Sequence, residues 1–154
     1  ISNRLTVALS IDTAAAAKAS FGTARTMLKS IKDDEGRPLN LKGTLLVVPP
    51  ALEDIANALM TNDKLEDGKP NPYKGTAKVL VCGWLETDTE WHLLDTSKAV
   101  KPIIFQPRKK PVFVQQTDTS SDAVFMRKKF KFGAEARGAA GYGLWQMAVG
   151  STGA

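Results

Sequence analysis

Residues 125–147 read FMRKKFKFGAEARGAAGYGLWQM and combine two patterns. From residue 124 to 136, apolar side chains at even positions alternate with charged side chains at odd positions, a period typical of a strand with one buried face. The glycine-rich run GAAGYG follows at 138–143. A nucleotide-binding loop, a nucleic-acid surface and a structural hairpin all use such residues, so the rest of the chain has to separate them.

The alternation predicts a long hairpin, with one strand at 124–136, a turn at 138–141 and a returning strand at 142–149. Phe130 and Phe132 are predicted to be buried, on the face opposite to the charged side chains. A strand of about 12 residues exceeds the usual five or six, so we expect a second surface to support it. The candidate for that surface is a long helix near the other end of the chain.

That helix is predicted over residues 14–32, with Asp12 or Thr13 as its cap and Gly36 after its end. Apolar side chains at intervals of three and four residues form one stripe along it: Ala17, Phe21, Ala24, Leu28 and Ile31. The opposite face carries basic side chains. The sequence therefore predicts a long amphipathic helix that lies on a core.

Between helix and hairpin, the sequence predicts a compact α/β centre. A buried strand at 44–48 enters a helix through Pro49 and Pro50, and an exposed loop occupies 61–75. The helix has a predicted buried face of Leu52, Ile55, Ala56 and Leu59. Four short strands are expected at 78–84, 91–94, 103–105 and 112–114.

The composition argues against several classes of enzyme. The 154 residues include 43% hydrophobic and 24% charged side chains, as in globular single domains. Cys82 and His92 are the only cysteine and histidine, which argues against a zinc site, a Cys/His pair or a Ser/His/Asp triad within one chain. Cys82 lies in an apolar run, so we expect a buried, reduced thiol. We also expect a soluble cytosolic protein without a bound cofactor or a membrane span.

Two further motifs have structural interpretations. GAAGYG has the order G-x-x-G-x-G, the reverse of the dinucleotide fingerprint, and precedes a strand-like segment instead of a helix, which favours a turn. Glu86, Asp88 and Glu90 alternate with threonines, and a polar turn is favoured there over a cation site.

The net charge of +5 favours acidic partners, including nucleic acid. Clustered basic side chains, with phenylalanines between some of them, are candidate contacts with another subunit or with DNA: Arg108, Lys109, Lys110, Arg127, Lys129 and Lys131. The alternation favours core aromatics beside a solvated or inter-subunit basic face over a stacking platform for bases.

Several ordered strings carry a family resemblance: LLVVPPALED at 45–54, NPYKGTAKVLV at 71–81, WHLLDTSKAVKPIIFQPRKKPVFV at 91–114 and VFMRKKFKFGAEARGAAGYGLWQMAVGSTG at 124–153. Together they resemble the C-terminal part of the major head subunit of Mu-like phages and prophages. The resemblance covers most of the chain, including the helix at 14–32. Because the chain opens with Ile1 instead of methionine, we expect it to be part of a longer subunit.

The resemblance implies an α+β protein of the Hong Kong 97-type capsid fold. It implies a peripheral domain with its spine helix at 1–38, an axial domain at 39–117 and the peripheral long hairpin at 118–154. The N-terminal arm and extended loop of such subunits are expected upstream of Ile1. No motif identifies residues for the lysine–asparagine cross-link that some relatives of the fold form.

The implied function is structural, without catalysis. Such a subunit self-associates into capsomers and a shell, encloses packaged DNA non-specifically, and works with scaffolding and other head proteins in the host cytoplasm, with no membrane partner. A candidate axial loop, ordered by neighbouring subunits, contains Asn62, Asp63, Lys64, Asp67, Lys69, Asn71, Tyr73 and Lys74. The alternatives are a sequence-independent nucleic-acid-binding module and a nucleotide-dependent enzyme that uses GAAGYG.

Overall fold

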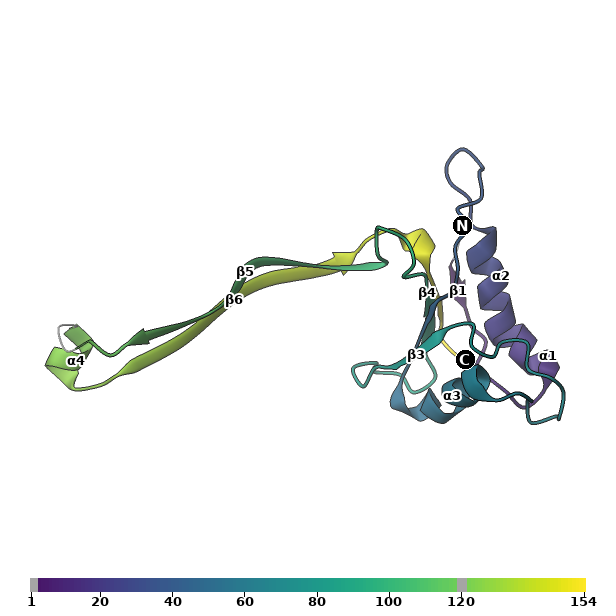
Figure 1. The fold of residues 1–154 in the computed structure, drawn as a ribbon, viewed down its shortest axis with the longest axis horizontal. Coiled ribbons are helices and arrows are strands. Elements are labelled where there is room, and N and C mark those ends of the chain that lie inside the picture. The colour runs from purple at the N-terminus through teal and green to yellow at the C-terminus, as the bar shows by residue number, and fades with distance from the viewer. Residues whose placement is uncertain (1–2, 119–121) are drawn as a thin grey trace. The chain divides into compact units, whose positions relative to one another are not determined.

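The computed structural model describes residues 3–118 and 122–154 of a mixed α+β chain (Figure 1). The described chain divides into two compact units. One contains Ile1–Pro102 and Gly143–Ala154, and the other contains Ile103–Tyr142. The larger unit holds the hydrophobic core.

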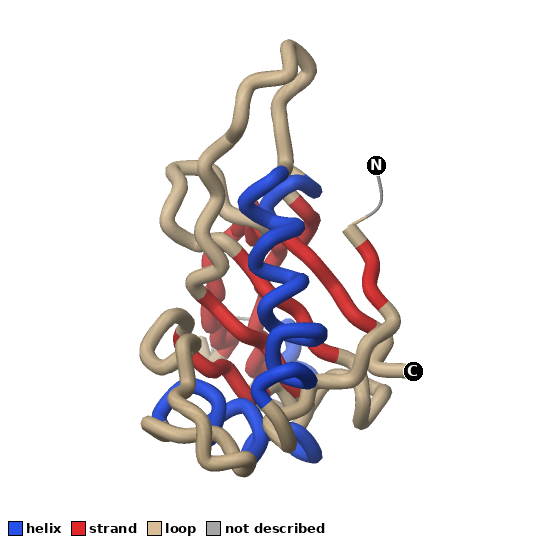
Figure 2. Tube along the Cα trace, turned by 90° about the vertical axis from the view of Figure 1, so that its right-hand side faces the viewer, coloured by secondary structure: helices blue, strands red, loops and turns tan. Residues whose placement is uncertain are grey.

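The larger unit is built on a mixed sheet with the strand order β1-β7-β4-β2-β3 (Figure 2). The strands are β1 (Arg4–Leu5), β2 (Leu45–Val48), β3 (Lys78–Val81), β4 (Trp91–Leu94) and β7 (Ala148–Ser151). Strand β4 runs antiparallel to β2 and β7, whereas β2–β3 and β1–β7 are parallel pairs. The sheet therefore takes strands from all three predicted domain ranges.

The predicted N-terminal helix is confirmed, with an irregularity that the sequence did not indicate. It consists of α1 (Ala14–Ala17), a π-helical turn at Lys18–Gly22 and α2 (Thr23–Ser30), and it lies across the sheet (Figure 2). Thr13 caps it by accepting a hydrogen bond from the Ala16 amide at 3.0 Å. All five predicted stripe residues are buried. The helix ends at Ser30, earlier than predicted, because Ile31 is already extended.

The second predicted helix is also confirmed. A 3-10 turn at Pro50–Leu52 precedes α3 (Glu53–Thr61), as the proline pair after β2 indicated. Ala56 and Leu59 are fully buried, while the other two predicted positions are partly buried. Met60 also joins the core. Cys82, expected to be buried, has intermediate exposure just after β3.

The smaller unit is a two-stranded antiparallel ribbon of β5 (Ile103–Gln116) and β6 (Lys131–Tyr142), with α4 (Asp122–Arg127) between the strands in sequence. The two short strands predicted at 103–105 and 112–114 are one strand. Register shifts accompany the basic run between Pro107 and Val112, and such bulges allow a strand to continue past prolines that cannot donate ladder hydrogen bonds.

The predicted hairpin topology is wrong. Strand β6 pairs with the preceding β5 instead of a following strand, and β7 joins the core sheet. Gly138–Gly141 lies within β6 and is not a turn. A Cβ atom on Gly138 would lie 2.7 Å from Cζ of Phe105, so the glycine accommodates a close aromatic ring. The glycine-rich run thus serves packing within the ribbon.

The predicted burial of Phe130 and Phe132 is also wrong. Each is 62% exposed, and residues 124–130, expected to begin the long strand, instead include the end of α4. The apolar stripe of the N-terminal helix belongs to the core cluster of the larger unit, together with sheet residues such as Leu46 and Val149. Period-two alternation is present in β6, but neither face of a two-stranded ribbon is covered within its own unit.

Candidate subunit interface

The ribbon unit carries the net charge of the protein. Residues 103–142 contain eight Lys and Arg against three Asp and Glu, whereas the rest of the chain contains thirteen of each. All six predicted basic contact residues belong to this unit: Arg108, Lys109 and Lys110 in β5, Arg127 in α4, Lys129 after it and Lys131 in β6. Each is exposed. The ribbon is therefore the part of the chain that attracts acidic partners.

The centre of the ribbon holds charges of both signs. Lys109 forms an ion pair with Glu135 and stands opposite Arg137 in the strand register. Arg108 and Arg137 line a shallow pocket of about 410 Å³ together with Gln106, Gly138 and Ala139. A pocket of this size with two guanidinium groups can accept a carboxylate or a phosphate.

The ribbon also exposes large apolar side chains. Phe113 in β5 and Phe132 in β6 stack on one face, with ring centroids 6.0 Å apart and an angle of 17° between the planes. Phe113 is 66% exposed. Further exposed apolar residues are Ile103, Ile104, Phe105, Val112, Val114 and Tyr142. The sequence identified these as strand residues but gave no signal of their exposure.

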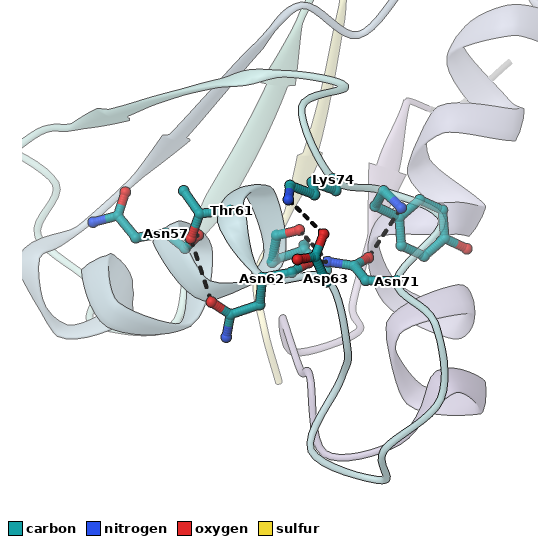
Figure 3. Close-up of polar contacts among 8 residues, drawn as sticks. Asn57, Thr61, Asn62, Asp63, Asn71 and Lys74 are labelled. Atoms are coloured by element: carbon teal, nitrogen blue, oxygen red, sulfur yellow. Dashed lines mark hydrogen bonds and ion pairs between the residues drawn. The ribbon is translucent and has the colours of Figure 1, made fainter.

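The predicted axial loop follows α3 and is held at Asn71 (Figure 3). The Asn71 amide group donates to the carbonyl oxygens of Leu59 at 2.7 Å and Asn62 at 3.0 Å, and its side-chain oxygen accepts from the Tyr73 amide at 2.9 Å. Asn71 is buried, so these bonds are shielded from water. All three bonds come from the same chain.

The remaining loop residues stay near the surface. Asp63 forms an ion pair with Lys74, and the Thr61 hydroxyl donates to the carbonyl oxygen of Asn57 (Figure 3). Lys64 forms an isolated bridge with Pro70. Leu65 is buried, although the turn-rich composition of the loop predicted an exposed segment.

Asp67 connects this loop to the N-terminal helix. Its carboxylate accepts hydrogen bonds from the amide of Ala14 at 2.8 Å and of Lys69 at 3.0 Å. These backbone donors, Ala14 first, hold the pKa of Asp67 below its ordinary value, and the Lys69 ammonium group contributes. The edge of the Tyr73 ring contacts Phe21, with centroids 5.4 Å apart. The loop and the helix thus form one surface.

Residues 3–118 and 122–154 contain neither a cluster of metal ligands nor a helix that could span a membrane. No group of three or more His, Cys, Asp or Glu side chains is placed to hold a metal ion there. Among the same residues, no helix is both long and apolar enough to cross a bilayer. A loop is also expected at 117–122, and its residues 119–121 lie outside the described residues.

Comparison with known proteins points to one family. The sequence profile described as "Mu-like prophage major head subunit gpT" matches residues 9–85 and 86–154. The chain is 59% identical over 59 residues to the major capsid protein of Escherichia phage Mu and 50% identical over 58 residues to the Mu-like prophage FluMu major head subunit of Haemophilus influenzae. Each match covers 38% of this chain and 19% of the relative. The matched stretch thus spans about a fifth of the length of these curated relatives.

Among solved structures, the chain resembles one in the procapsid of bacteriophage JBD30, computed in I4 symmetry. The two are 31% identical, with a TM-score of 0.36. The match covers 66% of this chain and 37% of the procapsid chain.

Proposed function

The chain belongs to the family of the Mu-like prophage major head subunit gpT, and on this premise we propose that it is part of a structural, non-catalytic subunit that builds a phage or prophage head. The observation that carries the proposal is the match of the family profile over two segments that span residues 9–154. The subunit associates with copies of itself into capsomers and a closed shell around DNA.

The fold of the complete subunit is of the Hong Kong 97 type. A long helix beside a sheet, and a long two-stranded ribbon, support this assignment. In it, residues 1–38 and 118–154 belong to the peripheral domain and residues 39–117 to the axial domain. The loop with Asn71 and Tyr73 then belongs to the axial domain, as do Arg108, Lys109 and Lys110 of β5. Arg127, Lys129 and Lys131 belong to the peripheral domain.

Self-association explains why the ribbon exposes so much apolar surface. Two strands without a covering layer are marginally stable in water, and exposed apolar patches mark interaction sites. Here every residue of β5 and β6 is exposed, including the stacked Phe113–Phe132 pair. Neighbouring subunits in the shell cover this apolar surface.

The basic side chains of the ribbon have two kinds of partner in this proposal. Arg108, Lys110 and Lys131 contact acidic groups of neighbouring subunits or the phosphates of packaged DNA without reading its sequence. Scaffolding and other head proteins are the further partners, and assembly takes place in the cytoplasm of the bacterial host.

Electron microscopy of the full-length subunit, expressed together with its own scaffolding protein, tests the proposal. We expect closed shells with repeating capsomers, into which the fold of residues 3–118 and 122–154 can be placed. A full-length subunit that remains monomeric under all assembly conditions would refute the assignment to a head protein.

A sequence-independent nucleic-acid-binding module is the second candidate function. The observation in its favour is the concentration of the whole net charge of +5 in the ribbon. A module of this kind would bind duplex DNA stoichiometrically as an isolated chain, with affinity that falls steeply as salt rises. The same titration on the head subunit should give only weak, non-saturating binding.

A further inference from the structure

A basic groove lies where the helix meets the loop in the larger unit. Its volume is about 550 Å³ and it is open to solvent, and residues from the π-helical turn, α2 and the loop line it. Gly22 leaves a notch that the Tyr73 ring occupies in part, because a Cβ atom there would lie 2.4 Å from the Tyr73 hydroxyl oxygen. The groove therefore has an aromatic wall and a floor without a side chain.

Three cations line this groove on one face of the helix: Lys18, Arg25 and Lys29. The Arg25 guanidinium lies 5.9 Å from the centroid of Phe21 and 5.8 Å from that of Tyr73. None of the ion pairs among the described residues involves any of the three. Like charges placed together in this way repel each other until an acidic partner arrives.

A complementary feature lies on another part of the same unit, in the turn after β3. Trp84 is 93% exposed, and Glu86 and Asp88 beside it are exposed as well. The base of the turn is fixed, since the Thr89 hydroxyl donates to the carbonyl oxygen of Thr152 at 2.9 Å. This turn extends away from α1 and α2 (Figure 1), and none of its residues lines the groove.

We propose that the acidic Trp84 turn, residues 84–88, docks into the basic groove of a second copy of this chain. The indole packs against Tyr73 and Arg25, and Glu86 and Asp88 pair with Lys18 and Lys29. A buried tryptophan that meets an arginine is the usual composition of an interface hot spot. The inference rests on the proposed function, because it names one of the contacts by which the subunits associate.

The contact is heterologous, since each copy offers the turn on one surface and the groove on another. Such head-to-tail contacts generate closed rings when the rotation between copies closes, as a capsomer requires. DNA is the less favoured occupant of the groove. The larger unit has thirteen charges of each sign, so it does not concentrate positive potential as the ribbon does.

Complementary variants test the contact directly. A groove variant, Arg25→Glu/Lys29→Glu, keeps an intact turn, whereas a turn variant, Trp84→Ala/Asp88→Lys, keeps an intact groove. Sedimentation velocity from micromolar to millimolar concentration should show reversible association of the unmodified chain, weakened at least about tenfold in each variant alone. An equimolar mixture should form a heterodimer and nothing larger, since one productive contact remains.

Lys42→Glu serves as the matched control, because this lysine is exposed and outside the groove. It should associate like the unmodified chain. The proposal is overturned if the unmodified chain stays monomeric, if both variants associate normally, or if the mixture forms no heterodimer. Loss of duplex DNA binding in the groove variant with unchanged self-association would instead identify a nucleic-acid site.

The same variants in the full-length subunit separate this inference from the proposed function. We expect neither variant to assemble shells alone. Normal shells from both would overturn the contact and leave the assignment to a head protein intact.

Discussion

Asp95 is a buried carboxylate that accepts several hydrogen bonds. Its carboxylate accepts from the Lys42 amide at 2.7 Å and from the amide and hydroxyl of Ser97 at 2.8 and 2.6 Å. Burial raises its pKa, but the Ser97 and Lys42 donors outweigh burial, so that the pKa lies below the ordinary value. These bonds fix the segment before β2 to the end of β4.

We predict that Asp95→Asn destabilises the protein by about 1–3 kcal/mol at pH 7, because the new amide nitrogen cannot accept the Lys42 hydrogen bond. A lowered native pKa means that the unfolded state binds the proton more readily. The contribution of Asp95 is therefore present above the ordinary pKa of about 3.9 and is lost as pH falls toward the native pKa.

Urea denaturation at pH 7 and at pH 3 measures both effects, with the exposed Asp34→Asn as control. The difference in unfolding free energy between the unmodified chain and Asp95→Asn should shrink at the lower pH. A difference that is the same at both pH values would contradict the role of the carboxylate.

At the scale of elements, sequence patterns predicted the correct secondary structure where one face of an element packs on a core. The stripe at Phe21 and Leu28, and the proline pair before α3, predicted real helices because burial and backbone restriction act locally. The candidate loop was found by its composition, although its buried anchor Asn71 was not separated from its exposed neighbours. That anchor depends on carbonyl groups of residues 59 and 62, which no local pattern encodes.

The patterns failed in the ribbon for an identifiable reason. Alternation gives the period of a strand but neither its partner nor what covers it. The prolines at 107 and 111 suggested breaks, yet the register shifts between β5 and β6 accommodate that region. The basic groove was missed because Tyr73 and Arg25 meet only in the fold.

The two kinds of element should respond differently to loss of an aromatic ring. We predict that Phe21→Ala, in the core, lowers the stability of the larger unit by about 3–5 kcal/mol. The matched Phe132→Ala removes only an exposed stacked pair and should leave the same transition within about 0.5 kcal/mol. Thermal unfolding followed by circular dichroism compares the two variants. Equal decreases in melting temperature would contradict the prediction, because the ribbon would then stabilise the larger unit as much as its core does.

At the scale of the whole molecule, the chain joins a unit that has its own core to a ribbon that has none. The larger unit buries Trp91, Phe21 and Leu28 and carries no net charge, whereas the ribbon is basic and exposes its aromatic side chains. In the proposed function, neighbouring copies of the subunit cover the ribbon.

Hydrogen–deuterium exchange on the isolated chain and on assembled shells measures this division most directly. We predict that amides of β5 and β6 exchange rapidly in the isolated chain, because two strands are marginal alone, and slow by at least about tenfold in the shell. Amides of β2 and β4 should be protected equally in both states. Unchanged exchange of β5 and β6 on assembly would contradict the account, because the ribbon would then have no partner in the shell.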